Sequence, residues 1–233
     1  MAALTKRVFV VMATVVLCSA FCLPPAEAAL VPIAITAEVT YVGDSHGLLE
    51  GRVNVGDLIT GVYIYDSSTP DSEPTEHKGV YKHYAPPAGI TLTVGGFVFM
   101  TDPDNIVFTV WIGNDSPPGL GGCWSDGYGL MSKKNLPLPN GTWLHHIRLG
   151  LSDCSHSALS SDTLPTTAPV LDDWDLTDAD IAFGGQRGSR GPSFHIDGHL
   201  TSAALIPEPA TFALLGIGTL VLLRSRERSS QTK

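Results

Sequence analysis

Apolar and polar residues alternate along much of the chain, which is the pattern of β-strands with one buried face. The alternation is clearest in the segment 33–41, where every second residue is apolar and the residues between are mostly polar. Successive side chains of a strand point to opposite faces, so one face of this segment is predicted to be buried: Ile33, Ile35, Ala37, Val39 and Tyr41.

Further strand patterns follow at intervals and are separated by turn-forming residues. They cover the ranges 58–65, 90–100, 106–112, 141–151 and 193–205. Within the second range, Gly95 and Gly96 provide the positive φ angles of a two-residue hairpin turn.

The segments between these strands have a different composition. Residues 114–129 are rich in glycine and proline and residues 155–170 in serine, threonine and proline, so both are predicted to be loops, while Leu171–Ile181 suggests a short helix. Many short strands joined by turns predict an all-β fold, an antiparallel β-sandwich or jelly roll.

The C-terminal end, residues 207–233, has a three-part pattern. Pro207-Glu208-Pro209 precedes an uncharged stretch of 14 residues, 210–223, and a basic end follows at once with Arg224, Arg226 and Arg228. As a helix the uncharged stretch would be about 21 Å long, which is short of the roughly 30 Å hydrocarbon core of a bilayer. The pattern predicts a hydrophobic helix whose basic end stays on the cytoplasmic side.

This three-part tail resembles the PEP-CTERM sorting signal of Gram-negative bacteria. The resemblance implies recognition by an exosortase-type membrane transpeptidase that cleaves near Pro207, Glu208 and Pro209, which are then substrate residues. It also implies transient anchoring in the inner membrane, delivery to the cell surface or outside, and a link to exopolysaccharide and biofilm. The alternative is an uncleaved tail that stays as an anchor or packs on the domain.

The N-terminal end has the pattern of a secretory signal peptide. Lys6 and Arg7 precede an uncharged stretch, and Ala26 and Ala28 form an A-x-A cleavage site. The predicted organisation is therefore a signal peptide (residues 1–28), one β-domain (29–206) and a sorting tail (207–233).

The predicted domain is acidic and keeps two of the chain's four cysteines. Residues 29–206 hold 20 Asp and Glu against 8 Lys and Arg, a difference of −12. This charge argues against nucleic acid as a partner and is compatible with divalent cations and neutral polysaccharide. In an oxidising compartment Cys123 and Cys154 are predicted to form a disulfide.

Two groups of side chains are candidates for a metal ion. Residues two apart on a strand point the same way, so one face of 193–205 carries His195, Asp197 and His199, which could hold zinc. The aspartates of 172–180 could hold Ca²⁺, although the spacing is not that of an EF-hand; they are Asp172, Asp173, Asp175, Asp178 and Asp180. The alternative for both groups is a solvated polar surface, with no cofactor at all.

Aromatic residues and cysteines suggest the remaining chemistry. Trp124 and Tyr128 fall in the predicted glycine-rich loop and could contact a glycan, whereas Trp111 and Trp143 fall in strands and are predicted to lie in the core. Cys154, with His195 as a base, is a weak candidate for a thiol nucleophile.

We therefore expect a non-enzymatic exported surface or matrix protein. A carbohydrate-binding module, with or without Ca²⁺, is the alternative, and a metal- or thiol-dependent hydrolase is a third.

Overall fold

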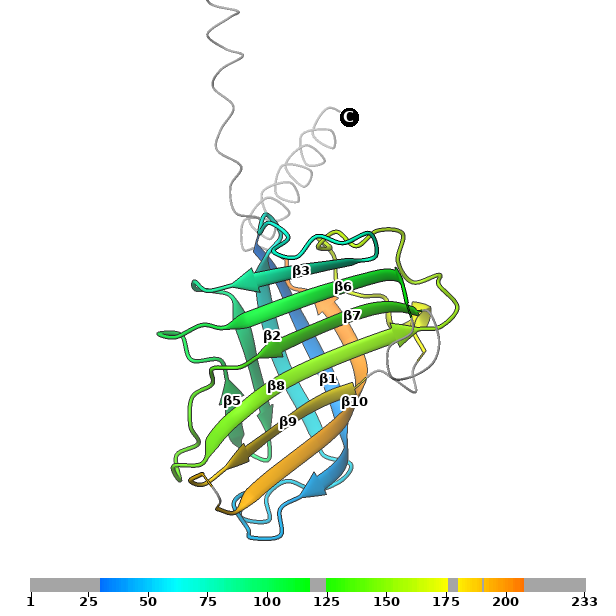
Figure 1. The fold of residues 1–233 in the computed structure, drawn as a ribbon. Coiled ribbons are helices and arrows are strands. Elements are labelled where there is room, and N and C mark those ends of the chain that lie inside the picture. Colours follow the sequence, from blue (N-terminus) through cyan, green and yellow to red (C-terminus); the bar gives the residue numbers. More distant parts are fainter. Residues whose placement is uncertain (1–29, 118–124, 176–179, 190, 208–233) are drawn as a thin grey trace, which may run out of the picture.

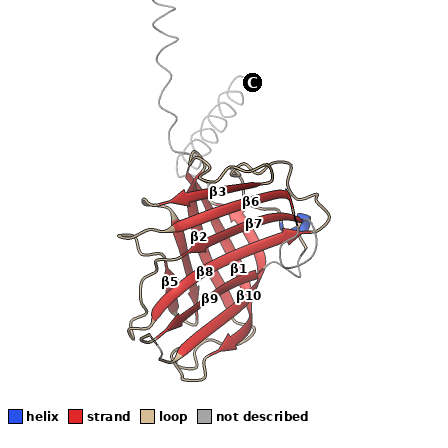
Figure 2. Ribbon diagram, in the orientation of Figure 1, coloured by secondary structure: helices blue, strands red, loops and turns tan. Residues whose placement is uncertain are grey.

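The computed structural model describes residues 30–117, 125–175, 180–189 and 191–207. Strands make up nearly all the regular structure in these ranges, and one short 3-10 helix, η1 (Leu171–Asp173), is present (Figure 2). The strands are β1 (Leu30–Gly43), β2 (Leu58–Asp66), β3 (Lys78–His83), β4 (Gly89–Val94), β5 (Phe97–Met100), β6 (Phe108–Ser116), β7 (Ser125–Ser132), β8 (Trp143–Asp153), β9 (Asp180–Gln186) and β10 (Ser193–Leu205).

All ten strands belong to one antiparallel sheet in the order β3-β6-β7-β8-β9-β10-β1-β2-β4-β5. The all-β prediction is thus confirmed, but the expected sandwich or jelly roll is wrong in its layering, since the strands form one continuous sheet that curls strongly (Figure 1). Register shifts in the β1–β10 ladder at Thr36/Ala37 and Val39/Tyr41 mark bulges, and bulges increase the local bend and twist of a strand.

Side-chain contacts across the sheet show how far it curls. The rings of Phe99 on β5 and Phe183 on β9 have centroids 4.7 Å apart, although these strands are five places apart in the sheet. In a flat sheet five places correspond to about 24 Å. Tyr63 on β2 and Tyr128 on β7 are equally separated in order, and their ring centroids are 6.5 Å apart. The curl therefore lets one sheet bury its own inner face.

Three buried tyrosines form the polar part of this core. The Tyr128 hydroxyl donates to the Tyr63 hydroxyl at 2.9 Å, and the Tyr65 hydroxyl donates to the carbonyl of Pro165 at 2.9 Å. Burial raises the pKa of Tyr63 and of Tyr128 well above the usual range and the pKa of Tyr65 to about 12. The hydroxyls therefore stay protonated and remain hydrogen-bond donors.

The predicted hairpin is confirmed in detail. β4 and β5 pair antiparallel around Gly95 and Gly96, whose φ angles are 57° and 77°. A side chain at Gly95 would collide with the carbonyl oxygen of Arg52. Glycine is required here for conformation and for space.

Three strands were not predicted, and two of them contain glycines opposite aromatic residues. On β7, within the expected glycine-rich loop, Gly129 pairs with Trp111 of β6, and a Cβ at Gly129 would fall into the Trp111 ring. On β9, within and after the expected helix, Gly185 pairs with Phe194 of β10 in the same way. Glycines in these strands make room for a neighbouring ring. The third missed strand is the edge strand β3.

The two ends of the described domain lie together. Ile33 of β1 pairs with Leu205 of β10, and the Ile206 N–H donates to the Pro32 carbonyl at 2.8 Å. The chain therefore leaves the sheet beside the start of β1, and we call this end the exit pole. The opposite end, where β10 begins at Ser193 next to Gln186 of β9, is the distal pole (Figure 1).

In the ranges that the structure describes, no helix is long and apolar enough to cross a membrane. The predicted signal peptide and the hydrophobic tail helix lie outside these ranges.

His83 is a buried titratable group within the aromatic core. Its side chain is 5% exposed, and its ring packs between those of Tyr65 and Phe108. Nδ1 lies 3.1 Å from the Thr69 hydroxyl, whereas Nε2 has no partner among the described residues. Burial lowers the pKa of His83 below its ordinary 6.5, and the charge of Asp66 opposes this shift only in part.

We therefore predict that part of the acid sensitivity of this fold comes from His83. Below about pH 6.5 the unfolded chain binds a proton at this residue before the folded chain does, so the free energy of unfolding decreases as the pH falls. The substitution His83→Phe should flatten this limb of the curve, measured by urea denaturation between pH 5 and 8. His46→Phe, at an exposed histidine, is the matched control, and an unchanged acid limb in His83→Phe would contradict the assignment.

Candidate functional site

A cleft of about 490 Å³ opens at the distal pole. It lies between the start of β8, the end of β9, the segment after β7 and the turn between β5 and β6. Trp143, the first residue of β8, is directly paired with Gln186, the last residue of β9, and both line the cleft.

Backbone hydrogen bonds hold the other wall in place. The Asp102 N–H donates to the Lys134 carbonyl at 3.0 Å, and the Lys133 N–H donates to the Val107 carbonyl at 3.0 Å. A single β-bridge joins Thr101 to Asn135. The β5–β6 turn and the segment after β7 therefore form one fixed wall, which carries Asp102, Lys133, Lys134 and Asn135 into the cleft.

Trp143 is the aromatic surface of the cleft, and its side chain is 62% exposed. The expectation that it lies in the core is wrong. A register shift between Leu144 and His146 in the β8–β9 ladder breaks the alternation of β8. Leu144 is consequently buried together with Ile147, and Trp143 is turned outward.

Asn135 is the buried polar group of the cleft. Its side chain is 7% exposed, and Nδ2 donates to the Ser132 carbonyl at 3.2 Å. The carbonyl can only accept, so this bond fixes which way the amide points. Oδ1 is left as a buried acceptor without a partner in the described part of the chain, and a buried acceptor is stabilised by a donor from water or a ligand.

The charge of the cleft differs from that of the domain. Lys133 and Lys134 are exposed at its rim, against one carboxylate in the lining, Asp102. That carboxylate also accepts the Asp104 N–H at 3.0 Å. Two of the eight basic residues of an acidic domain thus meet at this place.

The predicted glycan-contact pair is not where the sequence placed it. Tyr128 lies on β7 and is 2% exposed within the core, so it cannot stack on a ligand. Trp124 lies outside the described residues. The exposed aromatic residue that lines the distal cleft is Trp143, which the sequence pattern assigns to the core.

The metal candidates stay apart in the described structure. Nε2 of His195 lies 2.8 Å from Oδ1 of Asp197, but His199 is four residues from His195 along an extended strand, about 13 Å away. In the described ranges no three His, Cys, Asp or Glu side chains gather to hold an ion.

The aspartates of 172–180 are likewise dispersed. Asp172 and Asp173 lie on η1 and are exposed. Asp175 accepts the Cys154 N–H at 3.0 Å, and Asp180 begins β9. Asp178 is outside the described residues.

The sheet register separates Cys154 from its candidate base. His195 is level with Gly184 of β9, which is level with His146 of β8. Cys154 follows the end of β8, eight residues further on, or about 26 Å along an extended strand. Cys154 and His195 therefore do not form a nucleophile–base pair. The predicted disulfide involves Cys123, which lies outside the described residues, so it stays a prediction.

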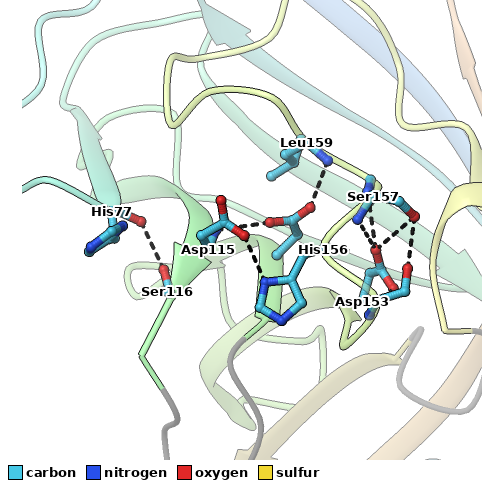
Figure 3. Close-up of polar contacts among 10 residues, drawn as sticks. His77, Asp115, Ser116, Asp153, His156, Ser157 and Leu159 are labelled. Carbon is cyan, nitrogen blue, oxygen red and sulfur yellow. Dashed lines mark hydrogen bonds and ion pairs between the residues drawn. The ribbon is translucent and has the colours of Figure 1, made fainter.

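A carboxylate with several hydrogen-bond donors lies at the other end of β8 (Figure 3). The carboxylate of Asp153, 3% exposed, accepts backbone N–H groups from Ser155, Ser157 and Ala158 at 2.7, 2.8 and 3.1 Å. Burial alone would raise its pKa, but these bonds and the serine hydroxyls hold the pKa of Asp153 well below its usual range. The ionised carboxylate thus ties down the loop that follows β8.

A second carboxylate ties the same loop to β6. Buried Asp126 accepts the N–H groups of Asp115 at 3.0 Å and Leu159 at 2.8 Å. On the surface, Nδ1 of His156 lies 2.7 Å from Oδ1 of Asp115 (Figure 3). We assign this cluster a structural role, because its carboxylates are already occupied by backbone donors.

We predict that Asp153→Asn destabilises the fold by about 2–3 kcal/mol, because an amide presents two donors to groups that themselves donate. In the wild type this stabilisation is present above the ordinary carboxyl pKa of 3.8 and is lost as the pH falls below it, since the unfolded chain takes up the proton first. Urea denaturation measures both effects. Asp173→Asn is the control, with an expected change of about 0.5 kcal/mol or less; equal effects of the two substitutions would contradict the assignment.

Comparison with known proteins identifies a motif at the C-terminal end. A family model, the PEP-CTERM protein-sorting motif, matches residues 205–228. No curated protein matches the chain, and no solved structure does. The matched segment begins at Leu205, the last residue of β10, and covers the Pro-Glu-Pro site and the three arginines noted above. The chain therefore carries the PEP-CTERM sorting motif at its C-terminus, which implies a protein that is exported and processed at the cell surface by an exosortase.

Proposed function

We propose that this protein is a non-enzymatic surface or extracellular-matrix protein that works in contact with exopolysaccharide. The observation that carries the proposal is the junction between domain and sorting motif. β10 ends at Leu205, and the motif begins at the same residue. The last strand of the sheet thus ends where the sorting motif begins, so cleavage near Pro207 would release an intact sheet.

The exit pole is the point at which the domain is joined to its tail before cleavage. The chain leaves the sheet through Ile206 and Pro207, beside the first residues of β1. A tail that is held in the membrane therefore places the exit pole toward the bilayer and the distal pole away from it.

A carbohydrate-binding module is the alternative, and the cleft favours it. Trp143, Asn135 and Gln186 combine an exposed aromatic ring with amide groups. A hydrolase is less well supported, because Cys154 and His195 are far apart and the described His195–Asp197–His199 face does not converge on one point.

Processing of the tail is the direct test of the proposal. In the host cell, the mature protein should end near residues 206–209, as mapped by mass spectrometry after cell fractionation. The double substitution Pro207→Ala/Pro209→Ala should leave the tail attached and move the protein to the membrane fraction. Ser229→Ala, in the same tail but outside the matched residues 205–228, is the control and should be processed normally. A wild-type mature protein that extends past Leu223 would refute cleavage and leave a permanent anchor.

The thiol content separates the non-enzymatic proposal from a cysteine hydrolase. We predict that the exported protein contains a Cys123–Cys154 disulfide and reacts with a thiol-alkylating reagent only after reduction. Intact-mass measurement before and after reduction reads this out. Alkylation of Cys154 without a reductant would favour the hydrolase.

A further inference from the structure

We propose that the cleft at the distal pole is a binding site for an anionic saccharide, such as a uronate-containing or sulfated sugar. The proposal rests on the proposed function, because only an exported protein meets the polysaccharide outside the cell. It adds a location in the fold and a ligand class.

The first argument is the exposed indole of Trp143. A tryptophan with 62% of its side chain exposed leaves a large apolar face in water at the rim of a cleft. The C–H face of a pyranose ring is apolar and flat, and it matches an aromatic ring in size. Stacking would remove this apolar surface from water, which favours binding.

The second argument is the set of amide groups around the ring. Asn105, Asn135 and Gln186 line the same cleft. Each amide has a donor and an acceptor, as each sugar hydroxyl has. Oδ1 of Asn135 is fully buried and Nε2 of Gln186 already donates to the Gly191 carbonyl at 3.1 Å. The amide groups open to a ligand are therefore that of the exposed Asn105 and the remaining acceptor of the half-buried Gln186.

The third argument is charge, and it selects acidic sugars over neutral ones. Lys133 and Lys134 stand together in the cleft, while the domain as a whole carries a large negative charge. An ammonium group attracts a carboxylate or sulfate, although an exposed ion pair adds little to affinity. The lysines thus add preference for acidic sugars, and most of the affinity comes from Trp143 and the amides.

Other anionic partners fit less well. A nucleic acid requires many phosphate contacts, and the acidic surface around two lysines repels a long polyanion of high charge density. A peptide of acidic residues alone would pair with the lysines but has no flat apolar ring to stack on Trp143. A saccharide with spaced charges uses all three features of the cleft.

The position of the cleft supports the same conclusion. β10 joins the distal pole to the exit pole and is 13 residues long, which is about 40 Å of extended strand from end to end. The cleft therefore lies far from the end at which the sorting tail leaves. It is accessible to a surrounding polysaccharide whether or not the tail has been removed.

The test uses the protein purified from the cells that export it, titrated by calorimetry. The acidic probes are oligogalacturonate and a chondroitin sulfate oligosaccharide, the neutral probe is a cello-oligosaccharide, and the acidic peptide is poly-glutamate. We expect at least one acidic saccharide to bind more tightly than the neutral one, with an affinity that falls as salt increases. Absence of binding to both acidic saccharides, or equal binding of the neutral sugar or of poly-glutamate, would overturn the proposal.

The variants test the site itself. Trp143→Ala should weaken binding of the acidic saccharide about tenfold or more, and Trp143→Phe should restore part of it. Lys133→Gln/Lys134→Gln should weaken binding roughly threefold to tenfold and flatten the salt dependence. The control is Tyr84→Ala, which removes an equally exposed aromatic side chain (66%) that lies near Leu30 at the exit pole. If Tyr84→Ala weakens binding as much as Trp143→Ala, the cleft is not the site.

The results of these binding experiments can be distinguished from the results of the tail-processing experiment. A protein that is exported and trimmed but binds no acidic sugar refutes the cleft and leaves the sorting function intact. A protein that retains its tail and still binds through Trp143 supports the cleft without support for cleavage.

Discussion

The structure depends on one constraint: a single sheet must bury its apolar face against itself. The described part of the chain provides no second layer of helices or strands to cover that face. Curling solves the problem by bringing strands from distant places in the sheet into contact, as the Phe99–Phe183 and Tyr63–Tyr128 ring pairs show. The twist of strands and the bulges of the β1–β10 ladder make this curl possible. Large aromatic rings then fill the enclosed space.

The sequence predicted the strands whose side chains follow period two, together with the Gly95–Gly96 hairpin. It did not reveal β7 and β9, because their glycines have low strand propensity when each strand is considered alone. Gly129 and Gly185 fit a strand only beside the rings of Trp111 and Phe194, which lie on neighbouring strands. The sequence pattern also could not predict the number of sheet layers, because alternation shows which face of a strand is buried and not what covers that face.

The cleft at the distal pole could not be predicted from the sequence either, because it too depends on how neighbouring strands pair. Alternation counted back from Ile147 along 141–151 places Trp143 on the buried face, and the bulge between Leu144 and His146 reverses that assignment. The prediction for Tyr128 was wrong in the opposite sense, since an exposed residue was expected and a buried one is found. Its glycine neighbours suggested a loop, although Tyr128 lies in a strand. The error at Trp143 came from local register and the error at Tyr128 from local composition, and both features depend in the fold on the partner strands. The charge of Lys133 and Lys134 was visible in the sequence, but nothing placed it beside a tryptophan.

The sorting motif and the proposed binding cleft lie at opposite poles of the domain. The cleft walls are held by backbone hydrogen bonds, including that from Asp102 to Lys134, and by the pairing of Trp143 with Gln186. A site fixed in this way needs little ordering when a ligand enters, so less of the interaction free energy is lost to conformational entropy. Cleavage or retention of the tail changes only the exit pole. Because the exit pole and the cleft lie at opposite ends of β10, neither outcome has a direct effect on the cleft walls. The proposed binding at the distal pole therefore depends on the fold of the described residues between 30 and 207, whereas sorting depends on the motif at residues 205–228.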